Sequence, residues 1–136
     1  MKVKLFNDEI FKFDTIDEFY DYEDFDEIET CTIKTIKIEE FIKLPKDLKE
    51  LCCQDNQIKI LNNLPENLKY LYCGNNQLQT LDKLPKKLQK LYCYDNQLQT
   101  LDNLPKNLKR LYCKNNSIIS INIPESVEYT DYKHSL

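Results

Sequence analysis

The sequence has few of the residues on which several common protein chemistries depend. It contains one glycine, one histidine and no tryptophan among its 136 residues. No phosphate-binding loop, paired-carboxylate site or nucleophile motif is present. The sole histidine, His134, is placed several coils away from Cys52, the one thiol expected to face outward, so it cannot act as that thiol's base. We therefore predict that the protein is not an enzyme, with no catalytic residues and no cofactor.

Long hydrophobic runs are also missing. No apolar stretch approaches the roughly 18 residues that a transmembrane helix requires. The opening MKVKLFNDEIF lacks the long apolar region of a signal peptide. We therefore expect no membrane association and a cytoplasmic, reducing location, which would be the host cytoplasm if the source is a virus or an intracellular bacterium.

What is present is one phrase repeated four times between Leu44 and Asn122. The copies open LPKDLKELCCQDNQIKIL, LPENLKYLYCGNNQLQTL, LPKKLQKLYCYDNQLQTL and LPKNLKRLYCKNNSIISI. They begin 20 residues apart, at Leu44, Leu64, Leu84 and Leu104. A fixed short period of this kind indicates the stacked coils of a solenoid, in which each coil buries its apolar side against the next.

The phrase LxxLxCxxNxL is similar to the leucine-rich repeat, with Cys in place of the third Leu. Its 20-residue period and its Leu-Pro opening resemble the short leucine-rich repeats of secreted bacterial effectors. The resemblance implies an α/β-type leucine-rich repeat solenoid that is almost all β: a right-handed, short-period coil with a parallel sheet on its concave face. It also implies a recognition surface.

Strands are predicted near residues 50–53, 70–73, 90–93 and 110–113. All five prolines follow Leu or Ile at the start of a coil. Proline fixes φ and lacks an N–H, so it is excluded from helix interiors and central strands. We therefore expect an extended, polyproline-like convex side, with no helix between residues 44 and 122.

One domain is predicted over residues 1–136. Residues 1–23 form an N-terminal cap: a hairpin of Lys2–Phe6 and Ile10–Asp14, then a helix of about Ile16–Tyr22 with a Thr15/Glu18 capping box. A degenerate first coil follows over 24–43, then four regular repeats over 44–122. A clipped terminal coil over 123–136 ends the chain, and its strand is an exposed edge.

Two columns of the repeat point inward and are structural. The asparagine column should bridge the backbone of consecutive coils, because an amide both donates and accepts hydrogen bonds. The cysteine column should pack as small apolar side chains, because a line of parallel thiols cannot surround a zinc ion and its Cβ atoms are too far apart for disulfides. The columns are Asn56, Asn76, Asn96 and Asn116, and Cys53, Cys73, Cys93 and Cys113. Cys52 should point outward, either as a reactive thiol or, as we favour, as a bystander.

The outward strand positions carry the candidate binding residues. Tyrosines aligned one strand apart, beside basic side chains, are typical of the centres of protein interfaces. Recent duplication of a strand-forming residue is the alternative explanation. The predicted concave-face residues are Tyr70, Tyr72, Lys90, Tyr92, Tyr94, Arg110, Tyr112 and Lys114.

Charge is divided unevenly along the chain. Residues 1–43 hold 6 basic and 13 acidic side chains, a net charge of −7, whereas residues 44–136 hold 13 and 10, a net of +3. The weak, mixed charge of the repeats argues against nucleic acid. We predict a module that binds a protein partner of unknown identity through its concave face. The alternative is a structural or self-associating protein, a homodimer formed through that face or through the C-terminal edge strand.

Overall fold

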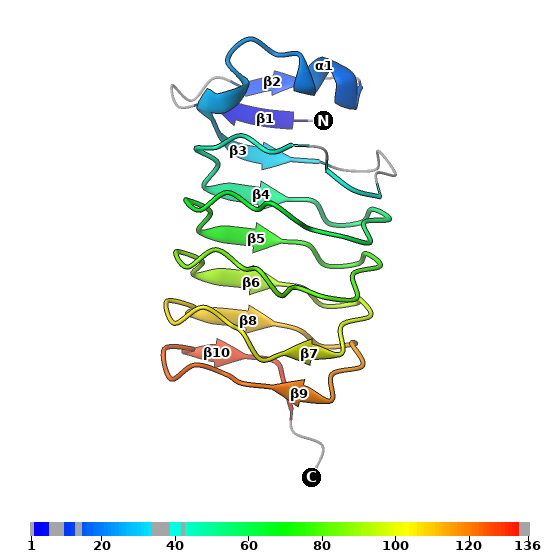
Figure 1. The fold of residues 1–136 in the computed structure, drawn as a ribbon, viewed down its shortest axis with the longest axis vertical. Helices are drawn as coiled ribbons and strands as arrows, with labels where there is room; N and C mark the ends of the chain where they lie inside the picture. Colours follow the sequence, from blue (N-terminus) through cyan, green and yellow to red (C-terminus); the bar gives the residue numbers. More distant parts are fainter. Residues whose placement is uncertain (1, 6–9, 13–14, 34–38, 42, 134–136) are drawn as a thin grey trace.

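The computed structural model describes residues 2–5, 10–12, 15–33, 39–41 and 43–133. Its coils stack along one long axis, with the N-terminal elements at one end and the last coil at the other (Figure 1). The predicted solenoid is confirmed. Among the described residues, no helix is long and apolar enough to cross a membrane.

A sheet of eight strands runs the length of the stack, in the order β10-β8-β6-β5-β4-β3-β1-β2. Six of the strands are parallel, one from each coil, and lie one below another in Figure 1. They are β3 (Ile28–Thr32), β4 (Glu50–Cys52), β5 (Tyr70–Tyr72), β6 (Lys90–Tyr92), β8 (Arg110–Tyr112) and β10 (Tyr129–Thr130). From β3 to β8, each strand residue pairs with the residue 20 positions later on the next strand. Leu51 pairs with Leu71, for example, and Leu71 pairs with Leu91. The four predicted strand positions are thereby confirmed.

The core is a set of apolar columns that run through the coils. The middle residue of each three-residue strand is fully buried, and its two neighbours are less so. Leu71, Cys73 and Leu78 show the pattern in one coil: all three are completely inaccessible to solvent. Because each coil contributes only a few such side chains, burial depends on contact with the coils on both sides.

The turns after β4, β5, β6 and β8 use Asn and Asp where glycine would be expected. Backbone φ is positive at one residue per turn, between 51° and 59° at Asp55, Asn75, Asp95 and Asn115. Asn and Asp tolerate this left-handed conformation better than other non-glycine residues. The column also alternates in charge, and the Asn75 and Asn115 amides donate to the carboxylates of Asp55 and Asp95 in the preceding coils. The turns therefore need no glycine, which explains how a chain with one glycine forms them.

The next residue in each turn is the asparagine of the inward column. The Asn76 amide donates to the carbonyls of Cys53, Cys73 and Gly74 at 3.0–3.2 Å. Its Oδ1 accepts the Ile58 N–H at 3.0 Å. Asn96 and Asn116 repeat this arrangement one coil further along. Asn56 makes the same amide contacts, reaching the Ile33 carbonyl of the preceding coil. One side chain thus joins the backbones of two coils.

The return side of the coils contains no helix between residues 44 and 122, as predicted. Each proline carbonyl instead accepts an N–H from the residue three positions later, as in Pro65 to Leu68 at 3.0 Å. These turns lead the chain back into the next strand. The structure adds a feature that the prediction lacked: β7 (Thr100–Leu101) and β9 (Ser120–Ile121) pair in parallel as a second, two-stranded sheet. Extended return segments of neighbouring coils lie at strand spacing, so they can pair wherever no proline intervenes.

The N-terminal hairpin consists of β1 (Lys2–Leu5) and β2 (Ile10–Lys12), paired antiparallel. β1 also pairs antiparallel with β3, so the hairpin continues the main sheet and covers its first strand. The predicted hairpin turn lies outside the described residues. The predicted capping box is present: the Glu18 N–H donates to the Thr15 hydroxyl, and the Thr15 N–H donates to the Glu18 carboxylate.

The predicted helix is two residues too long. α1 spans Ile16–Tyr20 and ends at Asp21, after which the chain turns into a short 3₁₀ helix, η1 (Phe25–Glu27). Phe19 and Phe25 are both buried, with ring centroids 5.0 Å apart. Bringing Phe25 back onto Phe19 requires the chain to reverse after Tyr20, so packing ends the helix before its local sequence would.

At the other end, β10 is the last strand of the sheet. It is only two residues long, and short edge strands limit pairing with other chains. Asp131 follows β10, and its carboxylate accepts the Cys113 N–H at 2.7 Å. A side chain thereby takes the place that the next strand's carbonyl fills in earlier coils, such as Tyr92 O for Cys73 N–H.

Candidate protein-binding face

The candidate site is the outward surface of the parallel strands, which we call the sheet face. Its residues flank the buried leucine of each strand, and so their side chains alternate with the core. It comprises Glu50, Tyr70, Tyr72, Lys90, Tyr92, Arg110, Tyr112 and Tyr129. Most are half-buried, whereas Arg110 and Tyr129 are exposed.

A row of stacked tyrosine rings runs across this face. Tyr72, Tyr92 and Tyr112 are register partners on β5, β6 and β8. Their ring centroids lie 4.9 and 4.2 Å apart, and the second pair is nearly parallel at 20°. Each ring contacts its neighbour, one pair tilted and the other stacked, so the row is ordered before any partner arrives.

A fourth ring extends the row beyond the three tyrosines that the repeat predicts. The Tyr129 ring lies 4.9 Å from that of Tyr112, although its backbone partner is Arg110. The contact is therefore diagonal across the sheet. Tyr129 is 50% exposed, which leaves one end of the row open to solvent.

Charged residues line the other side of the face. Along the sheet, the register places Glu50, Tyr70, Lys90 and Arg110 in sequence. The Lys90 ammonium lies 4.9 Å from the centre of the Tyr70 ring, a cation–π contact that holds it against the sheet. Acidic and basic groups thus occupy opposite ends of this column.

Tyr94 and Lys114, predicted at the strand ends, differ in their surroundings. The Tyr94 ring lies against the backbone of Gly74, where an added Cβ would be only 2.6 Å from Cζ. The Tyr94 hydroxyl accepts a hydrogen bond of 2.6 Å from Gln54 Nε2, two coils away. Tyr94 is therefore anchored within its own molecule, and the only glycine of the chain makes the room. Lys114 is exposed.

Burial raises the pKa of the Tyr72 hydroxyl above its usual value, and the Glu50 carboxylate raises it further. Burial and the Asp55 carboxylate raise the pKa of Tyr94 in the same direction. The raised pKa values keep both hydroxyls protonated well above neutral pH. The Tyr72 hydroxyl can donate a hydrogen bond to a carbonyl or carboxylate of a ligand.

The cysteines form the predicted inward column. Cys31, Cys53, Cys73, Cys93 and Cys113 are buried and unbridged, and Cys52 is half-exposed on β4. Burial is the main reason that the pKa values of all five buried thiols are raised; that of Cys113 is about 12. Among the described residues, no three His, Cys, Asp or Glu side chains are grouped closely enough to hold a metal ion.

Outward and inward side chains alternate along a strand, so the half-exposed Cys52 and the buried Cys53 should differ in reactivity. Under native conditions, a thiol reagent should modify Cys52 at least about a hundredfold faster than the buried cysteines, whose reaction must wait for the structure to open. Mass spectrometry of labelled peptides over time measures the rates, and labelling in denaturant provides the control in which all six react. Comparable native rates at Cys52 and Cys73 would contradict a packed cysteine column.

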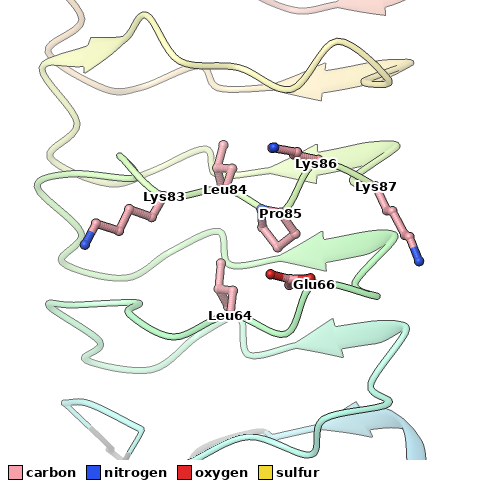
Figure 2. Close-up of a pocket in the computed structure, with 7 residues that line it drawn as sticks. All are labelled: Leu64, Glu66, Lys83, Leu84, Pro85, Lys86 and Lys87. Atoms are coloured by element: carbon pink, nitrogen blue, oxygen red, sulfur yellow. The ribbon is translucent and has the colours of Figure 1, made fainter.

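A shallow groove of about 410 Å³ lies on the return side, between the second and third regular repeats. Figure 2 shows its lining on the segments that run back between strands, with the sheet behind them. Its floor is apolar and its rim charged; the lining residues are Leu64, Glu66, Lys83, Leu84, Pro85, Lys86 and Lys87. None of them belongs to the sheet face. They supply matched positions for control substitutions.

Comparison with known proteins places the repeats in context. The family model for leucine-rich repeats (two copies) matches residues 46–86 and 66–106. A solved structure of YopM from Yersinia enterocolitica is 36% identical, with a TM-score of 0.67 over 70% of this chain and 21% of that one. A Shigella effector leucine-rich repeat domain is 28% identical, with a TM-score of 0.72 over 75% of this chain and 47% of that one. The chain thus spans about a fifth and about half of their lengths. No curated protein sequence matches.

Proposed function

Because the chain is a leucine-rich repeat protein whose repeats resemble those of bacterial effectors, we propose that it is a non-catalytic module that binds a protein partner through its sheet face. Folds of this kind generally mediate protein–protein interaction, and the two similar chains are an effector domain and a Yersinia protein. The observation that carries the proposal is the row of four tyrosines.

Physical reasoning favours the row as the centre of an interface. Tyr72, Tyr92 and Tyr112 are large, amphipathic and already ordered by their ring contacts, so these side chains lose little further entropy when a partner binds. The hydroxyls provide donors for a partner's backbone, and the rings provide apolar area. Tyrosine and arginine are among the residue types that most often dominate the binding energy of an interface.

The five buried thiols support a reducing compartment as the place where this module acts. Free cysteines persist in reducing compartments, whereas oxidising ones favour disulfides. We therefore propose that the partner is met in a cytoplasm, including that of a host if the protein is delivered there.

The test is a pull-down with the parent protein and with Tyr92→Ala, followed by calorimetry on the recovered partner. Tyr92→Ala should weaken binding by about 1–2 kcal/mol or more, because it removes the centre of the row. It should lower folding stability by only about 0.5–1.5 kcal/mol, the worth of the lost ring contacts. Lys86→Ala, on the return-side groove, should change neither.

Two results would contradict the proposal. One is equal affinity of the Tyr92→Ala variant and the parent protein, measured where both remain folded. The other is a homodimer whose contact buries Tyr92, detected by mass in solution and by protection of the ring. In that case self-association would be the function of the sheet face.

A further inference from the structure

The charged column beside the tyrosines contains two cations in direct register. Lys90 on β6 and Arg110 on β8 are paired residues of adjacent parallel strands, whose backbones lie about 4.8 Å apart. Like charges placed directly opposite each other in a sheet are destabilising. A sheet position that could carry a neutral or acidic side chain instead carries a local repulsion.

Elsewhere in this molecule, lysines in neighbouring coils are paired with carboxylates. Lys49 with Glu29, Lys59 with Glu39 and Lys109 with Glu128 form ion pairs from coil to coil. Within the described part of the chain, neither Lys90 nor Arg110 forms such a pair. The nearest acidic residue of the column, Glu50, is separated from Lys90 by the Tyr70 strand.

The two cations are also held differently. Lys90 is fixed over the Tyr70 ring, whereas the Arg110 side chain is exposed. Arg110 is the only arginine in the sequence, and its planar fork can bind a carboxylate through two parallel hydrogen bonds. An anion between the two groups would interact with both and relieve their repulsion.

The cations adjoin the stacked row. Tyr92 and Tyr112 lie two residues after Lys90 and Arg110 on the same strands, and therefore on the same side of the sheet. An extended segment lying across β5, β6 and β8 could place its backbone on the rings while its acidic side chains reach the cations. Glu50, at the far end of the column, would disfavour acidic residues there and so fix the direction of the segment.

We propose that the occupant of the sheet face is an acidic, extended segment of a partner protein, with Asp or Glu side chains bound between Lys90 and Arg110. This inference rests on the proposed function and adds the chemistry of the partner. The charge of the face supports an acidic occupant, and the ordered rings support one that is extended.

The experiment selects binders from a displayed random-peptide library on the immobilised protein. Selected peptides should be enriched in Asp and Glu beyond the library's composition. Binding of the best synthetic peptide, followed by fluorescence anisotropy, should weaken about tenfold or more in Arg110→Glu and in Lys90→Glu, and should weaken with added salt. Lys86→Glu makes the same charge change on the return side and should leave affinity within about twofold.

Further variants separate the possible failures. Arg110→Gln removes the charge from an exposed position, so chemical denaturation should confirm a parent-like midpoint while binding falls. Peptides that lose affinity in Tyr92→Ala, yet lack acidic enrichment and tolerate Arg110→Glu, would overturn the acidic partner and leave the proposed function standing. If no recovered peptide lost affinity in Tyr92→Ala, both the acidic partner and the proposed function would be contradicted. A dimer of the parent protein that Arg110→Glu dissociates would make a second copy the occupant and also overturn the inference.

Discussion

Raising the pH from about 8 to 10 should lower the free energy of unfolding by about 5 kcal/mol, because the buried cysteine column resists ionisation. The pKa values of Cys31, Cys53, Cys73 and Cys93 are raised above the ordinary value of 9.0, primarily by burial. In the unfolded chain these thiols lose their protons as the pH passes 9, whereas in the folded chain they retain them. The folded state therefore keeps its full stability below about pH 9 and loses it progressively above that value.

The size of this loss of stability is obtained by adding the contributions of the individual thiols. At one pH unit above its unfolded pKa, each thiol favours the unfolded state by about 1.4 kcal/mol, so four contribute about 5 kcal/mol. Since small domains are stable by only about 5–15 kcal/mol, this loss brings the protein close to unfolding by pH 10. Chemical denaturation at a series of pH values, with reductant present, measures the effect.

Two variants identify the thiols as its source. Cys73→Ala removes one buried thiol and should reduce the slope of stability against pH above pH 9 by about 1 kcal/mol per unit. Ile58→Val opens a cavity in the same core at a cost of about 0.5–1.5 kcal/mol and should leave the slope unchanged. An unfolding free energy that stays constant between pH 8 and 10 would mean that the thiols ionise in the folded chain, and hence that water reaches the column.

The repeat predicts most of the fold because the structure within each coil follows from the sequence of that coil alone. The strands at Glu50–Cys52 and Tyr70–Tyr72, the buried leucines and the absence of helix on the return side all follow from a 20-residue phrase that starts with Leu-Pro. In each case a short-range rule decides: alternation along a strand, or the missing N–H of proline.

Features that depend on how one coil meets another are less accessible from sequence. The β7–β9 pair, the Tyr94 ring over Gly74 and the diagonal contact of Tyr129 with Tyr112 each join side chains or backbones from different coils. Of these contacts, only the one at Gly74 could have been predicted from the sequence, because a single glycine in an otherwise regular repeat indicates a close approach of another group to the backbone.

The ends of the described solenoid depart from the regular repeat. Among the described residues β10 is the last strand of the sheet, and there the Asp131 carboxylate accepts the Cys113 N–H. At the other end, α1 stops early because Phe25 packs on Phe19. A rule taken from the repeat assumes a regular coil on each side, so it does not predict the contacts of the first and last described elements.

Replacing the buried asparagine should show how strongly consecutive coils are joined. Asn76→Ala should cost about 1–3 kcal/mol of stability, the penalty for leaving a buried backbone group without a partner. The Ile58 N–H would lose the acceptor it has in Asn76 Oδ1. The carbonyls that Asn76 also contacts are less affected, since Cys53 O still accepts from Asn56 and Cys73 O from Asn96. The single N–H therefore accounts for most of the expected loss.

Asn76→Asp separates the two halves of the amide. It keeps an acceptor for Ile58 but replaces the donor with a second oxygen, which would face the carbonyls of Cys53, Cys73 and Gly74 at about 3 Å. A buried carboxylate among carbonyl oxygens is costlier than a missing bond, so at neutral pH this variant should be less stable than Asn76→Ala.

Acidification should then reduce the difference in the free energy of unfolding between Asn76→Asp and the parent protein. The introduced carboxyl group would have a raised pKa in the folded state, so its protonated form, which can donate one hydrogen bond, is favoured there. Its destabilising effect is therefore smallest below the ordinary carboxyl pKa and grows as the pH rises above it. Asn103→Ala, at an exposed position of the third repeat, is the control and should shift the denaturation midpoint little. If Asn76→Asp proved as stable as Asn76→Ala at neutral pH, the carbonyls would have to be hydrated, and the column would not join the coils through its donors.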